Sequence, residues 1–203
     1  YSGGIWISGS SSTFTNMTVS NNIALNALET ESGGLWATSS TIAMVNSILW
    51  GNSQSQYYLS GSSLNASYSL VDQTSGSPTV AINGTGIIDS NPLFVDAANG
   101  DYRLSGFSPA IGAGTVDGAP ETDINGNLRP LPTGSNPDMG AYESSFASQR
   151  PKAGLVYDGL VDGDLVWSTN HNSMSGNWTP FMDNDTELTY EVAAALIPVD
   201  EQQ

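Results

Sequence analysis

The first ninety residues of the chain repeat themselves at two successive spacings. An offset of 30 positions superposes GGIW at 3–6 on GGLW at 33–36, and a further offset of 22 carries Trp36 to Tyr58. Such self-similarity indicates units that stack on one another. At these offsets three columns run through three units: Trp6/Trp36/Tyr58, Phe14/Met44/Ala66 and Val19/Leu49/Val71.

The units have the length and composition of parallel β-helix coils. A period near 22 suits one coil, and the eight extra residues of the first interval fall in a loop at 23–32. Runs at 13–19 and 41–50 are β-branched, apolar and bounded by Gly, Ser or Asn, as short strands are. After Val71 the register weakens, and 87–89 echoes 70–72 at a spacing of 17, which predicts a shortened terminal coil.

Aromatic residues in the repeat carry two predictions. We expect Trp36 to be buried between Trp6 and Tyr58 as one column of the stack. Trp50, Tyr57 and Tyr58 are also candidates for flat platforms on which sugar rings stack, although burial in the solenoid is the first expectation for Tyr58 and Trp50.

Asparagines recur at matching positions, with Asn16 over Asn46 and Asn22 over Asn52. Stacked side-chain amides can form a ladder in which each donates to the next carbonyl. Alternatively, Asn is present because it tolerates the left-handed turn conformation. Tyr68 replaces Asn in the third unit.

Charge and composition exclude several classes of partner. Lys and Arg total 4 against 20 acids, and the net charge of −16 repels nucleic acid and anionic lipid. Without cysteine there is no disulfide framework. No apolar run reaches the roughly 18 residues of a membrane-spanning helix, so we expect no transmembrane segment. The chain starts at Tyr1 inside a repeat, which suggests a fragment of a longer protein.

Five motifs follow the repeat in a fixed order. They are NPLFVD at 91–96, NGDYRL at 99–104, SPAIGAG at 108–114, DINGNLRP at 123–130 and DMGAYE at 138–143. Together they resemble the choice-of-anchor Q domain. The resemblance implies the end of a right-handed parallel β-helix, pectin-lyase-like in fold, in an exported bacterial surface protein.

The resemblance also implies roles within these motifs. In that family 91–96 opens the last coil, and the later motifs fold over the open end of the solenoid, which would cover unpaired backbone groups. Arg103 and Arg129 stand where the family has Arg. Their candidate partners are carboxylates: Asp101, Asp123, Asp138 and Glu143. Either a partly buried Arg–carboxylate pair holds the cap, or the pairs are solvated and contribute little.

Metal and cofactor sites have little support. Asp123, Asn125 and Asn127 offer oxygens at alternate positions, as calcium loops do, but Gly126 comes too early for an EF-hand. A plain turn is the alternative. We expect no other cofactor, and His171, the only histidine in the sequence, is expected to be a surface residue.

Catalysis requires a separate test because parallel β-helices include pectin-degrading enzymes. Glycoside hydrolysis needs two facing carboxylates, whereas residues 1–71 contain Glu29 and Glu31 alone, and no Lys or Arg precedes Arg103. We therefore expect no enzyme on these coils. Coils upstream of Tyr1 are the place where an enzyme could carry its catalytic residues.

The C-terminal quarter reads as a different unit. A polar stretch ends at Pro151, and short strand-like runs then resemble the opening of a fibronectin type III or immunoglobulin-like domain with Trp178 in an inner strand. About 50 residues remain, whereas such a sandwich needs roughly 100. This segment is therefore expected to be incomplete.

These observations predict an all-β protein. It has parallel β-helix coils at 1–90, an anchor-Q-like terminal coil and cap at 91–147, a linker at 148–151 and a partial β-sandwich at 152–203. The expected function is a non-catalytic structural or adhesive module outside a bacterial cell, with a surface polysaccharide or another cell-surface protein as partner. The alternatives are the C-terminal part of a polysaccharide lyase or glycoside hydrolase, favoured by stacked charged residues upstream, and a carbohydrate-binding module, favoured by a row of exposed aromatics.

Overall fold

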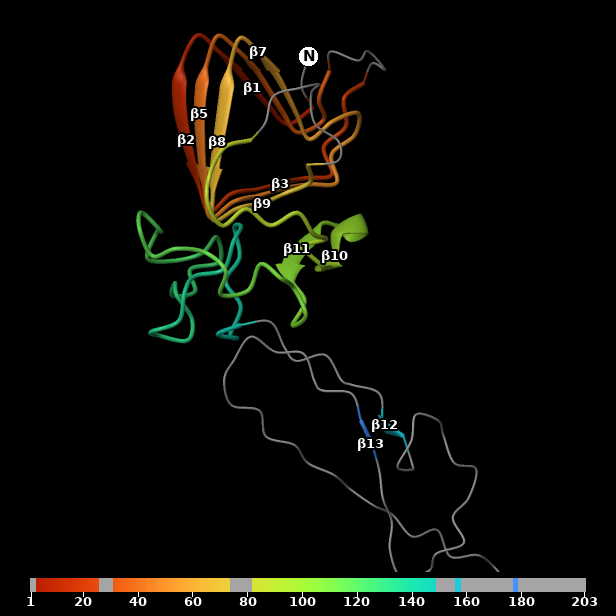
Figure 1. Cartoon of the computed structure of the whole chain (residues 1–203), viewed down its shortest axis with the longest axis vertical. Helices are drawn as coiled ribbons and strands as arrows, with labels where there is room; N and C mark the ends of the chain where they lie inside the picture. The colour runs from red at the N-terminus through yellow and green to blue at the C-terminus, as the bar shows by residue number, and fades with distance from the viewer. Residues whose placement is uncertain (1–2, 26–30, 74–81, 149–155, 158–176, 179–203) are drawn as a thin grey trace, which may run out of the picture.

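The computed structural model describes residues 3–25, 31–73, 82–148, 156–157 and 177–178. Nine strands in three successive coils form three parallel sheets, with one strand of each coil in each sheet (Figure 1). The sheets are β1 (Ile5–Ser8), β4 (Leu35–Thr38) and β7 (Tyr57–Ser60); β2 (Ser11–Thr15), β5 (Thr41–Val45) and β8 (Ser63–Ser67); and β3 (Thr18–Ser20), β6 (Ile48–Trp50) and β9 (Leu70–Val71). The described chain is thus all-β, with a β-helix-like solenoid at its N-terminal side.

The strand register is the one that the sequence offsets predict. All three expected columns are present as paired residues: Trp6/Trp36/Tyr58, Phe14/Met44/Ala66 and Val19/Leu49/Val71. The runs predicted at 13–19 and 41–50 are each two strands with a corner between them. Asn16 and Asn46 form these corners with a left-handed φ of 50°. An apolar run that continues through an Asn can therefore turn a corner of the coil.

Side chains that alternate between inward and outward positions along the strands form the core. Residues at every second position point into the coil, and the most deeply buried are aliphatic: Leu35, Ile42, Leu49, Leu64 and Val71, each at most 1% exposed. Because each column continues through neighbouring coils, a chain rich in Ser and Asn still forms a continuous apolar interior.

A short fourth turn extends two of the sheets by single bridges, Asn65 to Asn83 and Leu70 to Ile88. The offset is 18 residues, which corrects the expected spacing of 17. The Ile88 amide donates to the Ser69 carbonyl at 2.9 Å, and the Val71 amide donates to the Ile88 carbonyl at 2.9 Å. Backbone pairing therefore places Ile88 over Leu70, one position away from the alignment that side-chain likeness suggested.

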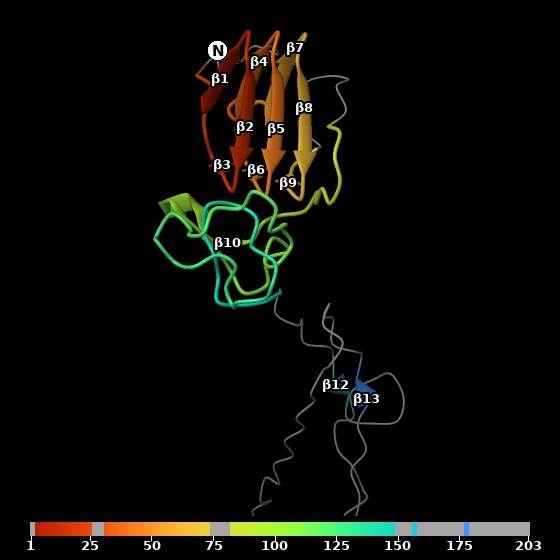
Figure 2. The ribbon, with the colours of Figure 1, turned by 90° about the vertical axis from the view of Figure 1, so that its left-hand side faces the viewer.

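Residues 91–148, here called the closing block, pack against the side of the solenoid. Figures 1 and 2 show them next to the sheet β3–β6–β9, alongside the stacked coils. This corrects the prediction of a cap over the open end. The reason is that β6 and β9 also turn apolar side chains outward: Ile48 and Leu70 are fully buried against Ala110 and Met139 of the closing block.

The closing block is mostly irregular. Its regular part is an antiparallel pair, β10 (Phe94–Asp96) and β11 (Asp101–Leu104), joined by a 3-10 turn at Ala97–Asn99. The motif at 91–96 therefore begins a hairpin, not the parallel coil that we expected. Asp96 caps the turn by accepting a hydrogen bond from the Asn99 amide, and this local closure directs β11 back along β10.

Little of the C-terminal quarter is described. Two short strands, β12 (Val156–Tyr157) and β13 (Asn177–Trp178), pair antiparallel. The rest of the predicted fibronectin-like segment, His171 and most of the linker at 148–151 lie outside the described residues. Within the described ranges, no helix has the length and hydropathy that crossing a membrane requires.

Candidate functional sites on the coil and in the closing block

An aromatic row runs across the outer face of the sheet β1–β4–β7. The rings of Trp6 and Trp36 stack with centroids 5.8 Å apart, and those of Trp36 and Tyr58 with centroids 6.0 Å apart, each pair within 10° of parallel. Trp6 is 59% exposed, and the other two are half-buried. The predicted register is right, but Trp36 is half-buried on the outer face and not buried as predicted, because Leu35 and Ala37 occupy the inward positions of β4.

The other aromatic candidates face elsewhere. Tyr57 points into the coil and is 5% exposed, which corrects its selection as a sugar platform. Burial raises the pKa of its hydroxyl, and the nearby charge of Asp72 adds to that rise. Trp50 is half-buried against the apolar cluster between the sheet β3–β6–β9 and the closing block. Only Tyr58 of these three belongs to the outward row.

Both predicted asparagine pairs form amide contacts. Asn46 Nδ2 donates to Asn16 Oδ1 at 3.3 Å, and Asn22 Nδ2 donates to Asn52 Oδ1 at 3.0 Å. Since Asn16 and Asn46 also have positive φ, the ladder and the left-handed turn are both present. The two explanations for these residues are therefore complementary.

The Asn16–Asn46 ladder also holds the closing block, a role that the sequence did not suggest. The Asn46 side chain exchanges two hydrogen bonds with the backbone of Thr115, at 2.7 and 2.8 Å, and the backbone carbonyl of Asn46 accepts from the Gly140 amide at 2.7 Å. Asn16 Nδ2 donates to the Asp138 carbonyl at 3.0 Å. The Asn side chains at two stacked corners thus bind segments 69 and 122 residues away in the sequence.

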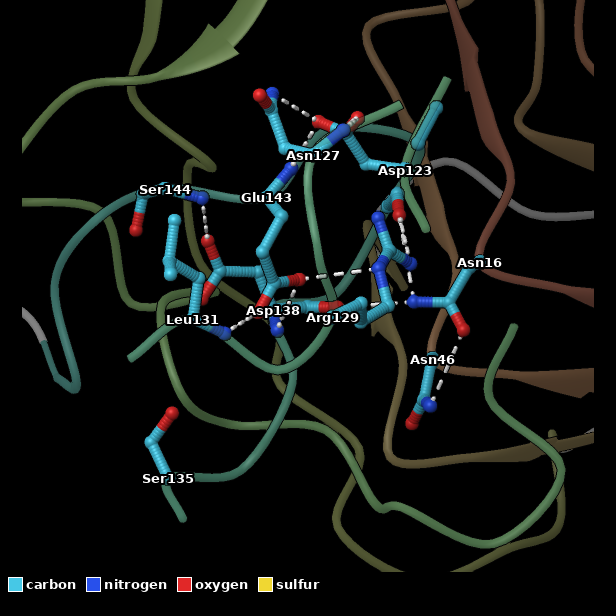
Figure 3. Close-up of polar contacts among 12 residues, drawn as sticks. Asn16, Asn46, Asp123, Asn127, Arg129, Leu131, Ser135, Asp138, Glu143 and Ser144 are labelled. Atoms are coloured by element: carbon cyan, nitrogen blue, oxygen red, sulfur yellow. Dashed lines mark hydrogen bonds and ion pairs between the residues drawn. The ribbon is translucent and has the colours of Figure 1, made fainter. Parts of the chain in front are cut away.

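A buried ion pair lies behind this contact. Arg129 Nε is 3.1 Å from Glu143 Oε2, and the two side chains are 1% and 0% exposed (Figure 3). Arg129 Nη1 also donates to the Gly140 carbonyl at 3.1 Å. Glu143 accepts from the backbone amides of Leu131 at 3.0 Å and Asp138 at 3.1 Å. The buried pair that we expected to hold the cap is formed by these two residues.

Two further carboxylates complete the cluster. Asp138, fully buried, accepts from the amides of Gly112 at 2.8 Å and Ser144 at 2.7 Å. Asp123 accepts from the Glu143 amide at 3.0 Å. Three acids and one arginine therefore share this interior, and backbone amides provide most of the donors.

Burial and hydrogen bonding shift the pKa values of the carboxylates in this cluster in opposite directions. Burial raises the pKa of Glu143 to about 7, with the charge of Asp138 as the next cause, against the lowering effect of its amide donors and Arg129. Burial likewise raises the pKa of Asp138 and lowers that of Arg129. Asp123 is the exception: burial acts to raise its pKa, but its hydrogen bonds from Glu143, Asn127 and Asn125 outweigh burial and lower it.

Arg103 forms a solvent-exposed ion pair, the alternative to a buried Arg–carboxylate pair. Its guanidinium pairs with Asp101 at 2.6 Å, with side-chain exposures of 62% for Arg103 and 27% for Asp101. The hydrogen bond from Arg103 lowers the pKa of Asp101 to about 2. The two residues are two positions apart on β11, so their side chains lie on the same face. This pair is local to the hairpin.

The weak calcium candidates form a turn. Asp123 Oδ1 accepts from the amides of Asn125 at 2.8 Å and Asn127 at 2.9 Å, and Oδ2 accepts from Asn127 Nδ2 at 3.0 Å. The carboxylate oxygens thus orient their own loop, as Asx turns do. In the part of the chain that the structure describes, His, Cys, Asp and Glu do not gather into a group of three or more that could hold a metal.

No protein-family model, curated protein or solved structure matches the chain. The fold and the contacts above therefore carry the functional interpretation.

Proposed function

We propose that this chain is a non-catalytic structural and adhesive module of an exported bacterial cell-surface protein. The order of the closing-block motifs, which resembles choice-of-anchor Q, supports this assignment together with the three-sheet parallel solenoid. We further propose that the solenoid is a right-handed, pectin-lyase-like β-helix, and that residues 152–203 begin a fibronectin type III-like domain.

The absence of charged residues from the coil strands is the observation that carries the proposal. None of the nine strands β1 to β9 contains Asp, Glu, Lys, Arg or His. General acid–base cleavage of a glycosidic bond needs such groups at defined separations. A polysaccharide lyase or hydrolase would therefore have to place its catalytic residues outside these strands.

The charged residues of the closing block favour a structural role. The Arg129–Glu143 pair is buried, and Asp123 and Asp138 accept hydrogen bonds from the backbone that surrounds them. Groups arranged in this way hold loops in position and are shielded from a substrate. They hold the loops of the closing block together.

Cell labelling tests the proposed location. Antibodies raised against residues 3–148 are applied to intact and to permeabilised cells of the bacterium that produces the chain. We expect equal labelling of both. Labelling that requires permeabilisation would reject a surface location.

Product assays test the proposed absence of catalysis. The chain is incubated with neutral and acidic polysaccharides, and reducing ends and unsaturated products are measured. We expect neither above a heat-treated sample. Turnover that disappears on substitution of a residue in β1 to β9 would show that the module is an enzyme.

A further inference from the structure

The three sheets of the solenoid present three different outer surfaces. The sheet β3–β6–β9 is covered by the closing block. The sheet β2–β5–β8 exposes small hydroxyl side chains at its edge, Ser11, Thr41 and Ser63. The sheet β1–β4–β7 lies on a side of the coils away from the closing block (Figure 1). The aromatic row stands on its outer face, since the alternate residues of these strands are the buried ones. Its outer face is the one where large rings meet solvent.

The rings in this row are displaced sideways from one another. Parallel strands lie about 4.8 Å apart, whereas the ring centroids are 5.8 and 6.0 Å apart with nearly parallel planes. Each ring is therefore shifted relative to the next, and part of its face is not covered by its neighbour. Trp36, which has a stacked ring on each side, is still only half-buried, so part of an interior ring of the row reaches solvent.

A second row on the same face consists of hydroxyl groups. Ser8, Thr38 and Ser60 follow the aromatic residues by two positions and pair in the same register. Two positions along a strand are about 7 Å, so hydroxyls run parallel to the rings at that distance. Ser8 and Ser60 are exposed, and Thr38 is half-buried. Aromatic faces and hydroxyls side by side match the apolar faces and hydroxyl edges of sugars.

Charge narrows the class of ligand. The strands β1, β4 and β7 carry no charged residue, and the whole chain has a net charge of −16. That charge repels acidic polysaccharides. A neutral sugar chain carries no charge, so its binding to this face has no electrostatic repulsion to overcome and requires no charged partner.

We propose that the outer face of β1–β4–β7 binds a neutral glycan that lies across the coils, parallel to the direction of stacking. The inference rests on the proposed adhesive role and names its ligand class. Successive coils repeat the same ring and hydroxyl positions, so a chain of repeated sugar units contacts several equivalent positions at once. Repeated contacts raise the overall affinity above that of a single ring–sugar contact.

Affinity electrophoresis of the full chain tests this inference. The protein migrates through native gels containing hydroxyethyl cellulose or galactomannan as neutral probes, and polygalacturonate as the acidic comparison. We expect at least one neutral polysaccharide to slow migration and polygalacturonate to have no effect. No retardation by either neutral probe would overturn the inference, as would retardation by polygalacturonate alone.

Variants locate the binding face. Trp6→Thr and Trp36→Thr should each weaken binding about fivefold to tenfold, whereas Trp36→Tyr, which keeps a ring, should bind more tightly than Trp36→Thr. Tyr102→Ala, in β11 of the closing block, removes an aromatic ring away from the row and should bind like the unmodified chain. Trp6 is already largely exposed, so its variant remains informative if Trp36→Thr fails to fold. Equal retardation of the Trp6→Thr variant and the unmodified chain would place the glycan elsewhere and reject the inference.

The result is separable from the proposed function. Labelling of intact cells without retardation in the gels rejects the glycan ligand and leaves the surface module in place. Labelling that requires permeabilised cells rejects the surface module itself, because the location test does not depend on the sugar.

Discussion

Asn46 lies directly over Asn16 in the coil stack, and the side chain that joins the two coils at 3.3 Å also binds the backbone of Thr115. One amide therefore links two coils and the closing block. Its left-handed backbone, with φ of 50°, makes the same residue the corner of the coil.

Replacing Asn46 should destabilise both connections. We expect Asn46→Ala to lower the free energy of unfolding by about 3 kcal/mol, because it leaves partly buried backbone groups of Thr115 without partners and puts Ala at a positive φ. Asn46→Gly also loses the side-chain hydrogen bonds but avoids the strain of Ala at a positive φ, so its free energy of unfolding should lie between those of Asn46→Ala and the unmodified chain. Urea unfolding measures the stability of both variants. Asn65→Ala, on the exposed face of β8, is the control and should stay within about 0.5 kcal/mol of the unmodified chain. Full stability of Asn46→Gly would show that the amide contributes nothing.

The Arg129–Glu143 pair should be sensitive to loss of one partner. Arg129→Met leaves Glu143 and Asp138 buried without a cation, and we expect a loss of about 3–5 kcal/mol in unfolding free energy. Arg103→Met removes an arginine whose pair is solvent-exposed and should leave the melting temperature unchanged. Equal effects of the two substitutions would contradict the distinction between a buried and a solvated pair.

Stability should depend on pH in a direction set by Glu143. Burial raises its pKa from 4.5 to about 7, so the folded state holds a proton that the unfolded state releases. The resulting stabilisation is present in full below about pH 4.5 and is lost as the pH rises through about 7, by an amount on the order of 1–3 kcal/mol. The pKa of Asp123 is lowered, so this residue affects stability at acidic pH. Its contribution to the free energy of unfolding disappears as the pH falls through its folded-state pKa. Chemical unfolding from pH 4 to 8 measures the curve, and Glu143→Gln should flatten its upper part.

The position of Trp36 predicts a smaller effect than a core aromatic would have. Because its ring lies on the outer face and is half-buried, we expect Trp36→Ala to cost about 1–2 kcal/mol. Ile42→Ala, at a position with no exposure in the core, should cost about 2–5 kcal/mol. Guanidinium unfolding compares them directly, and a larger loss for Trp36→Ala would mean that the aromatic row, not the interior, holds the coils together.

Removing residues 149–203 should leave the coils and the closing block intact. The sequence from 144 to 151 has the polar, proline-terminated composition of a linker, so the two sides are expected to fold separately. We expect the melting temperature of the truncated chain to equal that of the corresponding transition in the full chain. A large decrease would show that the C-terminal segment belongs to the main fold.

The coil register was predictable because it depends on residue identity at a fixed offset. The predicted end cap is wrong about the position of the closing block, although the sequence contains a signal for the lateral position. In β6 and β9 the adjacent residues Ile48-Leu49 and Leu70-Val71 are both apolar, and two successive apolar residues in a strand indicate that both faces are covered. The column Val19/Leu49/Val71 predicted from the repeat contains only the inward member of each pair.

The closing-block arginines show the limit of sequence reasoning at the candidate site. Both were expected to pair with carboxylates, and both do, but only Arg129 is buried. Arg103 has an acid two residues before it on the same strand face, so a local surface pair satisfies it. Arg129 pairs across the fold with Glu143, and a linear sequence does not report which distant backbone amides also converge there.

The lateral position of the closing block changes how the coil stack can come apart. Solenoids whose units touch only their neighbours can fray from one end, one unit at a time. Here Thr18 of the first coil accepts a hydrogen bond from the Ala141 amide at 3.0 Å, and Leu70 of the third coil is buried against the same block. The block thus contacts the first and the third coil at once, so detaching the first coil breaks its contacts with the block as well as those with the next coil. We therefore expect the coils to resist separation from one end more than a solenoid without such a block.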